Sequence, residues 1–149
     1  MRILLDTHAF LWFFTNDPKL SLPALSQIAD RANEVLISPA RYWEVAIKVS
    51  LGKYPLSVSF EQFWTAGIIE NDFRVLPITV AHASTLVSLP VHHKDPFDRM
   101  IISQAITEQI PVVSASPSTR QNATRAGAKQ IWRARHEERG TRRPGFRFR

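Results

Sequence analysis

The 149-residue chain contains no cysteine and no hydrophobic run long enough to span a lipid bilayer. The absence of cysteine excludes a disulfide framework and any metal site built from thiolates. The apolar run at residues 9–14 is far shorter than a membrane span. Because Asp6 follows the first apolar residues directly, we expect no signal peptide, no membrane partner and a cytoplasmic protein.

Basic charge is concentrated at the C-terminal end. Residues 1–115 hold 9 Lys/Arg and 11 Asp/Glu, a net charge of −2, whereas residues 116–149 hold 10 and 2, a net charge of +8. The length and the 44% apolar content predict one globular domain with a single core, over residues 1–132. We expect the arginine-rich residues 133–149 to form a mobile basic tail, or to add a non-specific grip on RNA.

Apolar runs and helix-start signals alternate along the chain. They predict strands at residues 2–5, 34–37, 74–76 and 110–114, and helices at residues 7–15, 21–32, 39–51, 59–69, 79–87 and 95–106. This alternation is typical of an α/β fold, in which helices flank a parallel sheet through right-handed crossovers.

Two of the predicted helices have apolar patterns with consequences for function. Helix 7–15 is apolar all the way round, so it is either wholly buried or partly exposed for a partner. In helix 39–51 we expect an apolar stripe to face the core, with Glu44 on the same side. That stripe consists of Ala40, Trp43, Ile47 and Leu51.

Three carboxylates fall where an open parallel sheet binds its ligands, at the carboxyl ends of the strands. Asp6 ends the first strand, Glu44 lies in the helix after the second, and Asp98 opens the helix before the fourth. Carboxylates packed together repel one another, so a divalent cation is their natural counter-ion. Oxygen ligands favour Mg²⁺ or Mn²⁺ over Zn²⁺, and such an ion commonly acts on phosphates.

Each acid also has a purely structural interpretation. Asp6 could cap helix 7–15, and Glu44 could pair with Lys48 one turn later. Asp95 is a natural N-cap, with Asp98 in the first turn of the same helix. The residues alone leave these alternatives open.

Four segments carry a specific combination of motifs: Leu4–His8, Ser38–Lys48, His93–Arg99 and Pro111–Ala115. Together they resemble PIN-domain ribonucleases and, more narrowly, VapC-type toxins of type II toxin–antitoxin systems, over roughly residues 1–132. The resemblance implies a three-layer α/β/α sandwich with a central, mostly parallel sheet of four to five strands. It also implies RNA cleavage with Mg²⁺ or Mn²⁺, a homodimer, and a cognate antitoxin that inserts a segment near the site. Helix 7–15 is a candidate interface for such partners.

The resemblance also assigns roles to particular residues. Asp6, Glu44 and Asp98 fall on three of the family's acidic positions, which implies catalytic and metal-binding roles, with Asp6 and Asp98 as the first ligands. Thr7 and Asp95 are expected to support them.

The chain departs from the family pattern after the fourth predicted strand. The family usually has a fourth acid there, whereas this chain has Ser116, and a neutral hydroxyl is a weaker Mg²⁺ ligand. Lys48, Lys94 and Arg99 lie beside the acids and are candidates for contacts with RNA phosphates.

These observations lead to one main functional hypothesis and two alternatives. The main one is a Mg²⁺-dependent endoribonuclease toxin, with transfer RNA as one candidate substrate. An alternative is a weak or inactive PIN fold that binds antitoxin or RNA without cutting, for which Ser116 is the support. A phosphatase or DNA nuclease could use the same carboxylates.

Overall fold

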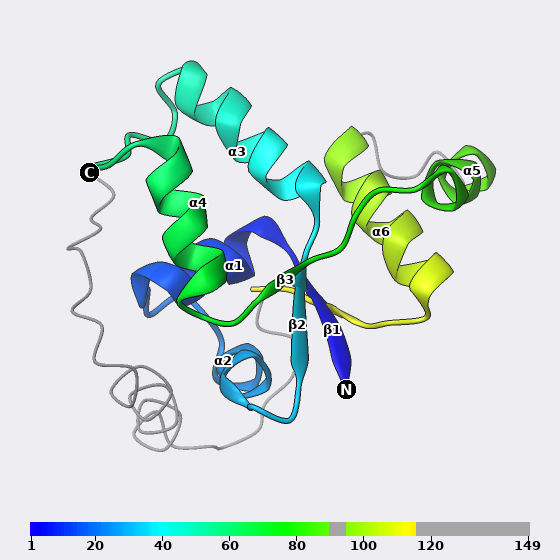
Figure 1. Cartoon of the computed structure of the whole chain (residues 1–149), viewed down its shortest axis with the longest axis horizontal. Helices are drawn as coiled ribbons and strands as arrows, with labels where there is room; N and C mark the ends of the chain where they lie inside the picture. Colours follow the sequence, from blue (N-terminus) through cyan, green and yellow to red (C-terminus); the bar gives the residue numbers. More distant parts are fainter. Residues whose placement is uncertain (90–94, 116–149) are drawn as a thin grey trace.

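A computed structural model of the chain describes residues 1–89 and 95–115. Within these segments the elements follow the order β1 (Arg2–Leu5), α1 (Thr7–Thr15), α2 (Leu22–Ala29), β2 (Glu34–Ile37), α3 (Pro39–Ser50), α4 (Phe60–Ile69), β3 (Arg74–Val75), α5 (Val80–Ser88), α6 (Pro96–Glu108) and β4 (Val112–Val113). The strands form one sheet in the order β3-β2-β1-β4, and every neighbouring pair is parallel (Figure 1). The predicted tail, residues 133–149, lies outside the described residues.

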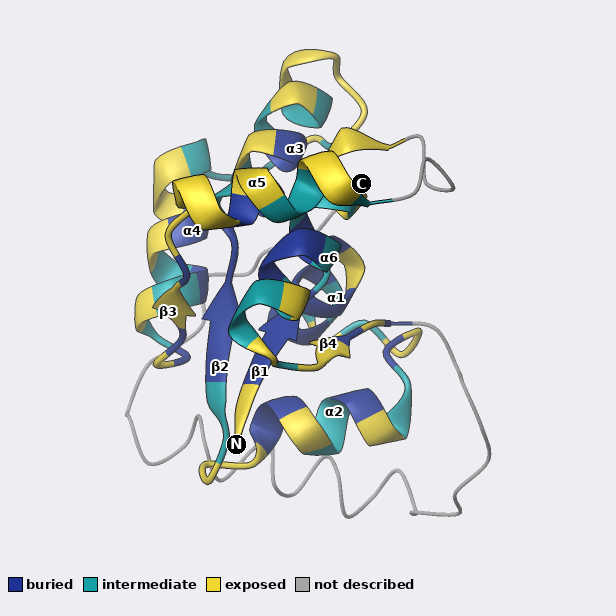
Figure 2. Cartoon of the chain, turned by 90° about the vertical axis from the view of Figure 1, so that its right-hand side faces the viewer, coloured by how far each residue is buried: buried dark blue, intermediate teal, exposed yellow. Residues whose placement is uncertain are grey.

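Helices cover both faces of the sheet, which gives three layers (Figure 1). Side chains of β1 alternate between the faces, as strand geometry requires. Ile3 and Leu5 pack into a large core with α1, α2 and α4, whereas Leu4 packs with Ile101 of α6 on the other face. The α/β/α sandwich with a parallel sheet is therefore confirmed. Strands β1 and β2 form its buried centre (Figure 2).

Helix α1 belongs to the larger core. Phe10, Phe13 and Phe14 are at most 4% exposed, and the Phe10 ring stacks on Trp64 with the ring centroids 4.5 Å apart. At Gly67 a Cβ atom would lie 2.7 Å from Phe10 Cζ, so the close approach of α4 requires glycine. Phe13 and Phe14 therefore give no support to the predicted dimer and antitoxin interfaces, whereas Trp12 of the same helix is half-buried.

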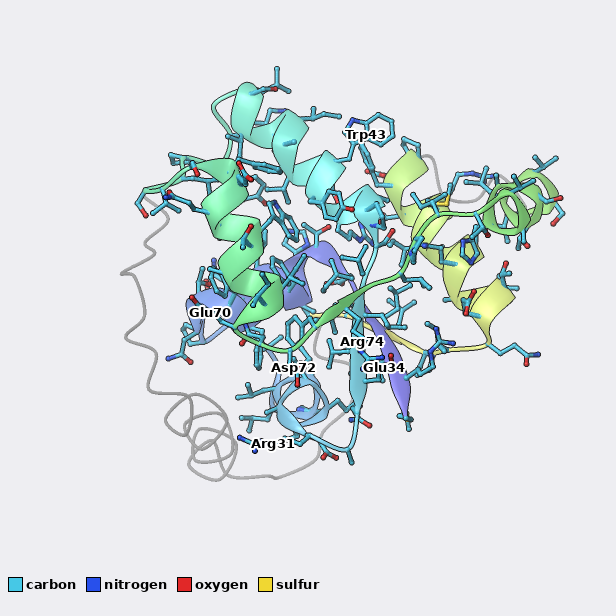
Figure 3. All side chains as sticks on the ribbon, viewed as in Figure 1. Arg31, Glu34, Trp43, Glu70, Asp72 and Arg74 are labelled. Carbon is cyan, nitrogen blue, oxygen red and sulfur yellow. The ribbon has the colours of Figure 1, made fainter. Side chains whose placement is uncertain are left out.

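The predicted orientation of α3 is wrong for three of its four apolar residues. Ala40 is buried, but Trp43 is 64% and Leu51 63% exposed, and Ile47 is exposed as well. The buried side of the helix instead carries two charged side chains, in the set Ala40, Arg41, Glu44 and Val45. Trp43 accordingly projects outward from α3 beside the start of α6 (Figure 3).

Helix α6 is held against α5 by polar contacts. Ser103 Oγ donates a hydrogen bond to the carbonyl of the buried His82, and Nε2 of His82 lies 3.2 Å from Glu108 Oε1. These contacts fix the helix that carries Asp98. No helix in the two described segments is long and apolar enough to cross a membrane.

Candidate active site

Asp6 lies directly after β1 and is the N-cap of α1. Its Oδ1 accepts a hydrogen bond from the Ala9 backbone N–H at 2.6 Å, so the predicted capping role is confirmed. The backbone N–H of Ala115, just after β4, approaches Oδ2 at 3.4 Å. The ends of the two neighbouring strands therefore meet at this carboxylate.

Glu44 is buried, at 7% exposure, and accepts hydrogen bonds from three side chains. Thr7 Oγ1 and Arg41 Nη1 donate to Oε2 at 2.5 and 3.0 Å, and Lys48 Nζ donates to Oε1 at 2.5 Å. The sequence left two alternatives for the Glu44 side chain, a position facing the core or an ion pair with Lys48, and the structure shows both. Because Thr7 follows Asp6 in the chain, these contacts join α3 to the end of β1.

The environment of Glu44 keeps it ionised. Burial by itself would raise the pKa of the Glu44 carboxyl, but hydrogen bonds from Lys48, Thr7 and Arg41, together with the charge of Lys48, lower the pKa below its ordinary value. Burial would likewise lower the pKa of Lys48, but the bond to Glu44 raises it above its ordinary value. At neutral pH the pair is therefore fully charged.

Asp98 lies in the first turn of α6, and its side chain is 53% exposed. Asp95 caps this helix, because its Oδ1 accepts hydrogen bonds from the N–H groups of Phe97 and Asp98 at 2.8 and 3.2 Å. Asp98 Oδ1 accepts a hydrogen bond from Arg41 Nη1 at 3.2 Å. The same arginine nitrogen therefore bridges Glu44 and Asp98.

The three predicted acids thus lie at one edge of the sheet, connected through Thr7 and Arg41. Their oxygens are the donors that Mg²⁺ and Mn²⁺ prefer. Asp6 Oδ2 accepts one long hydrogen bond, from the Ala115 N–H at 3.4 Å, and Asp98 Oδ2 accepts none from the described residues, so both oxygens keep lone pairs for a metal ion. Both Glu44 oxygens already bind cations, and residues 1–89 and 95–115 contain no group of three or more acids or histidines arranged to hold a metal ion.

The predicted RNA-binding residues have internal partners where they are described. Lys48 binds Glu44 and also lies over the Tyr54 ring, 5.5 Å from its centroid. Arg99 Nη2 donates to the carbonyls at the end of α5, at 3.1 and 3.2 Å. Lys94 and Ser116 lie outside the described residues.

Two further residues lie in this region, Arg41 and Trp43. The sequence suggested no functional role for Arg41 and predicted Trp43 to be a core residue. The spacing of Arg41 and Glu44 could have indicated a helical ion pair, but no sequence signal relates Arg41 to Asp98. The Trp43 ring contacts the half-buried Phe97 edge-on, with the ring centroids 5.4 Å apart, which places an exposed tryptophan beside the acids.

Replacing Glu44 with glutamine should lower the free energy of unfolding by about 2–4 kcal/mol at pH 7, because Arg41 and Lys48 lose their buried counter-charge. A lowered folded-state pKa stabilises the fold above the unfolded value of 4.5, and this stabilisation is lost as the pH falls through the folded-state pKa. Urea unfolding from pH 7 downward should therefore show the difference between wild type and Glu44→Gln shrinking below about pH 4.5.

The exposed Glu61 of α4 offers a matched control, and Glu61→Gln should change stability by less than about 1 kcal/mol. A difference for Glu44→Gln that stays constant across this pH range would contradict the assigned role.

Comparison with known proteins agrees with this architecture. The crystal structure of VapBC2 from Rickettsia felis, bound to a DNA fragment from their promoter, matches with a TM-score of 0.54 and 19% identity, covering 75% of this chain and 86% of that chain. The structure of VapBC-1 from nontypeable Haemophilus influenzae matches with a TM-score of 0.50 and 18% identity, covering 88% and 92%. At these identities the matches show a shared fold.

No curated protein sequence matches the chain. The PIN-domain family profile, however, matches residues 3–117, from β1 to just beyond β4. The matched region contains Asp6, Glu44 and Asp98 and most of the chain. The chain therefore belongs to the PIN-domain family.

Proposed function

We propose that this PIN-domain protein is a VapC-type toxin of a type II toxin–antitoxin pair, an endoribonuclease that depends on Mg²⁺ or Mn²⁺. PIN domains are generally metal-dependent nucleases. The observation that carries the proposal is the gathering of Asp6, Glu44 and Asp98 at the carboxyl edge of a parallel sheet. The likeness of fold to two VapBC structures supports it.

The roles proposed for the acids follow from their surroundings. Asp6 and Asp98 would hold the ion, since each has an oxygen with room for a ligand. The bound ion would activate a water and stabilise the leaving oxygen of an RNA phosphodiester. Glu44, already neutralised by Arg41 and Lys48, would hold α3 against β1.

Three further residues would support these acids. Thr7 orients Glu44 through its hydroxyl, and Asp95 fixes the first turn of α6, where Asp98 lies. Ser116, at the family's fourth acidic position, would offer the ion a neutral oxygen in place of a charged one.

A second candidate function is binding of RNA or an antitoxin without cleavage. One observation favours it: Arg41 and Lys48 occupy both oxygens of Glu44, and Arg41 also binds Asp98. A metal ion would therefore find fewer unoccupied carboxylate oxygens than the three acids contain.

Wild-type protein should cleave a mixed transfer-RNA pool with Mg²⁺ or Mn²⁺ and not with EDTA. Asp98→Asn should reduce the rate by about 100-fold or more, because the ion supplies several kcal/mol of transition-state stabilisation. The exposed Asp30 lies just before β2, at the opposite end of the sheet, so Asp30→Asn should keep full activity. Gel analysis of the cleavage products checks the metal dependence and the rates of the two variants.

Ser116→Asp separates the two candidate functions. If the missing acid only weakens ion binding, this variant should cleave faster than wild type at limiting Mg²⁺. An inactive wild type together with an active Ser116→Asp would favour the second function, and full activity of Asp98→Asn would contradict the first.

We also propose an antitoxin as a partner, because the fold is shared with two VapBC structures, and a homodimer, which only the family resemblance implies. Light scattering should then give a mass of about 34 kDa for the protein alone, twice the 17.0 kDa of one chain. A mass of one chain at micromolar concentration would contradict the dimer.

Trp43 is a candidate for stacking on an RNA base. It is exposed, adjoins Glu44 in the chain and contacts Phe97, the neighbour of Asp98. Trp43→Ala should weaken binding of a single-stranded RNA in EDTA by about 1–3 kcal/mol, the range for one stacked base. Fluorescence anisotropy of a labelled RNA measures this.

Ile69 of α4 is equally exposed and apolar, at 67%, so Ile69→Ala serves as the control and should bind RNA like wild type. Unchanged RNA affinity of Trp43→Ala, together with a smaller mass by light scattering, would instead assign Trp43 to a protein interface.

A further inference from the structure

Arg41 is a buried cation placed among the acids of the site. It lies in the first turn of α3 and is 4% exposed. The start of a helix disfavours positive charge, and burial of a guanidinium is unfavourable unless anions meet it. Glu44 and Asp98 are the anions that its Nη1 contacts, at 3.0 and 3.2 Å.

The guanidinium uses little of its hydrogen-bonding capacity in these contacts. Arginine commonly binds a carboxylate through two parallel N–H bonds. Here Nη1 alone serves two carboxylates, which lie on different helices, and the buried Nε has no partner among the described residues. A buried donor left unpaired is unfavourable, so the arrangement is held by charge more than by complete hydrogen bonding.

The two carboxylates hold Arg41 unequally. Glu44 is buried, fixed by Thr7 and Lys48, and lies on the same helix as Arg41. Asp98 lies across the helix interface, and its side chain is 53% exposed. The contact between Arg41 and Asp98 is therefore the one that can open to solvent, while the contact with Glu44 persists.

We infer that Arg41 is an exchangeable counter-cation of this site: through Oδ1 it neutralises Asp98 when no divalent ion is bound, and it competes with an ion on the same carboxylate for the negative charge of Asp98. The inference rests on the proposed function, because it takes Asp98 to be a metal ligand. Arg41 is accordingly a positioning residue that sets the affinity for the ion.

The same geometry indicates what Arg41 does once the ion holds Asp98. The guanidinium then has free N–H groups beside the site, and phosphate oxygens match them well. An RNA phosphate would compensate the charge that Asp98 no longer supplies. Ion and RNA should therefore each strengthen the binding of the other.

The experiment is calorimetric titration of Mn²⁺ into the full chain at low ionic strength. Asp98→Asn should lose the site. Arg41→Met, which removes the competing charge and keeps a long apolar side chain, should bind Mn²⁺ about tenfold more tightly than wild type, the effect expected when a competing charge-assisted hydrogen bond is removed.

Lys48→Met is the matched control, because it also removes a cation from Glu44 but leaves Asp98 and Arg41 in contact. Its Mn²⁺ affinity should change by less than about threefold, because the Lys48 charge would act on the ion only at longer range and is screened by salt. An equal gain for Lys48→Met and Arg41→Met would overturn the specific role of Arg41.

Thermal unfolding adds a readout that does not depend on cleavage. In EDTA, Arg41→Met should melt below wild type, because Glu44 and Asp98 lose their shared cation. Mn²⁺ should raise its melting temperature by more than it raises that of wild type. Should Arg41→Met not fold, Arg41→Lys replaces it: one ammonium spans two carboxylates less well, so Mn²⁺ binding should tighten by a smaller factor.

The outcomes separate the inference from the function on which it rests. Equal Mn²⁺ affinity of wild type and Asp98→Asn would remove the proposed metal site, and the inference with it. In the other case, Asp98→Asn loses Mn²⁺ binding while both Arg41 variants bind Mn²⁺ as well as wild type or more weakly. The proposed metal site then stands, but the inference that Arg41 competes with the ion is overturned.

Discussion

The buried carboxylate of Glu44 is the interaction on which the geometry of the site depends. A charge at 7% exposure must be met by cations and hydrogen bonds, and here three side chains meet it. Thr7 can reach Glu44 only because β1 ends at Asp6, which caps the helix that Thr7 begins. Arg41 in turn reaches Asp98 on α6. The partners of this one buried charge thus link α3 to the end of β1 and, through Arg41, to the start of α6.

This polar cluster lies at the edge of an apolar framework that holds it in place. On one face of the sheet, aromatic side chains of α1 and α4 pack closely enough that Gly67 has no room for a side chain. On the other face, Leu4 and Ile101 fix α6 against the strands, and polar contacts fix α6 against α5. Both layers are thus anchored by contacts outside the cluster of acids, to which the buried ion pairs of Glu44 add further stability.

Most of the fold could be predicted from the sequence because its helices begin with local signals. Asp6, Ser38 and Asp95 cap their helices as their positions indicated, and such contacts span only a few residues. The orientation of α3 could not be predicted in this way. Periodicity favours apolar Trp43 over charged Arg41 as the buried residue, but Arg41 is buried because it meets Glu44 on its own helix and Asp98, 57 residues away. The acids of the candidate site were named from the sequence, whereas the contact of Arg41 with Asp98 on another helix has no local signal.

The charges at this edge give the proposed function a physical basis. Asp6, Glu44, Asp98 and Asp95 contribute four negative charges and Arg41 and Lys48 two positive ones, so two negative charges remain. A bound divalent ion would compensate these two negative charges. A carboxylate in place of Ser116 would add one more negative charge and favour a second ion. In the proposed function, Ser116 and Arg41 would therefore act in the same direction, because both reduce the negative charge that the site offers to a divalent ion.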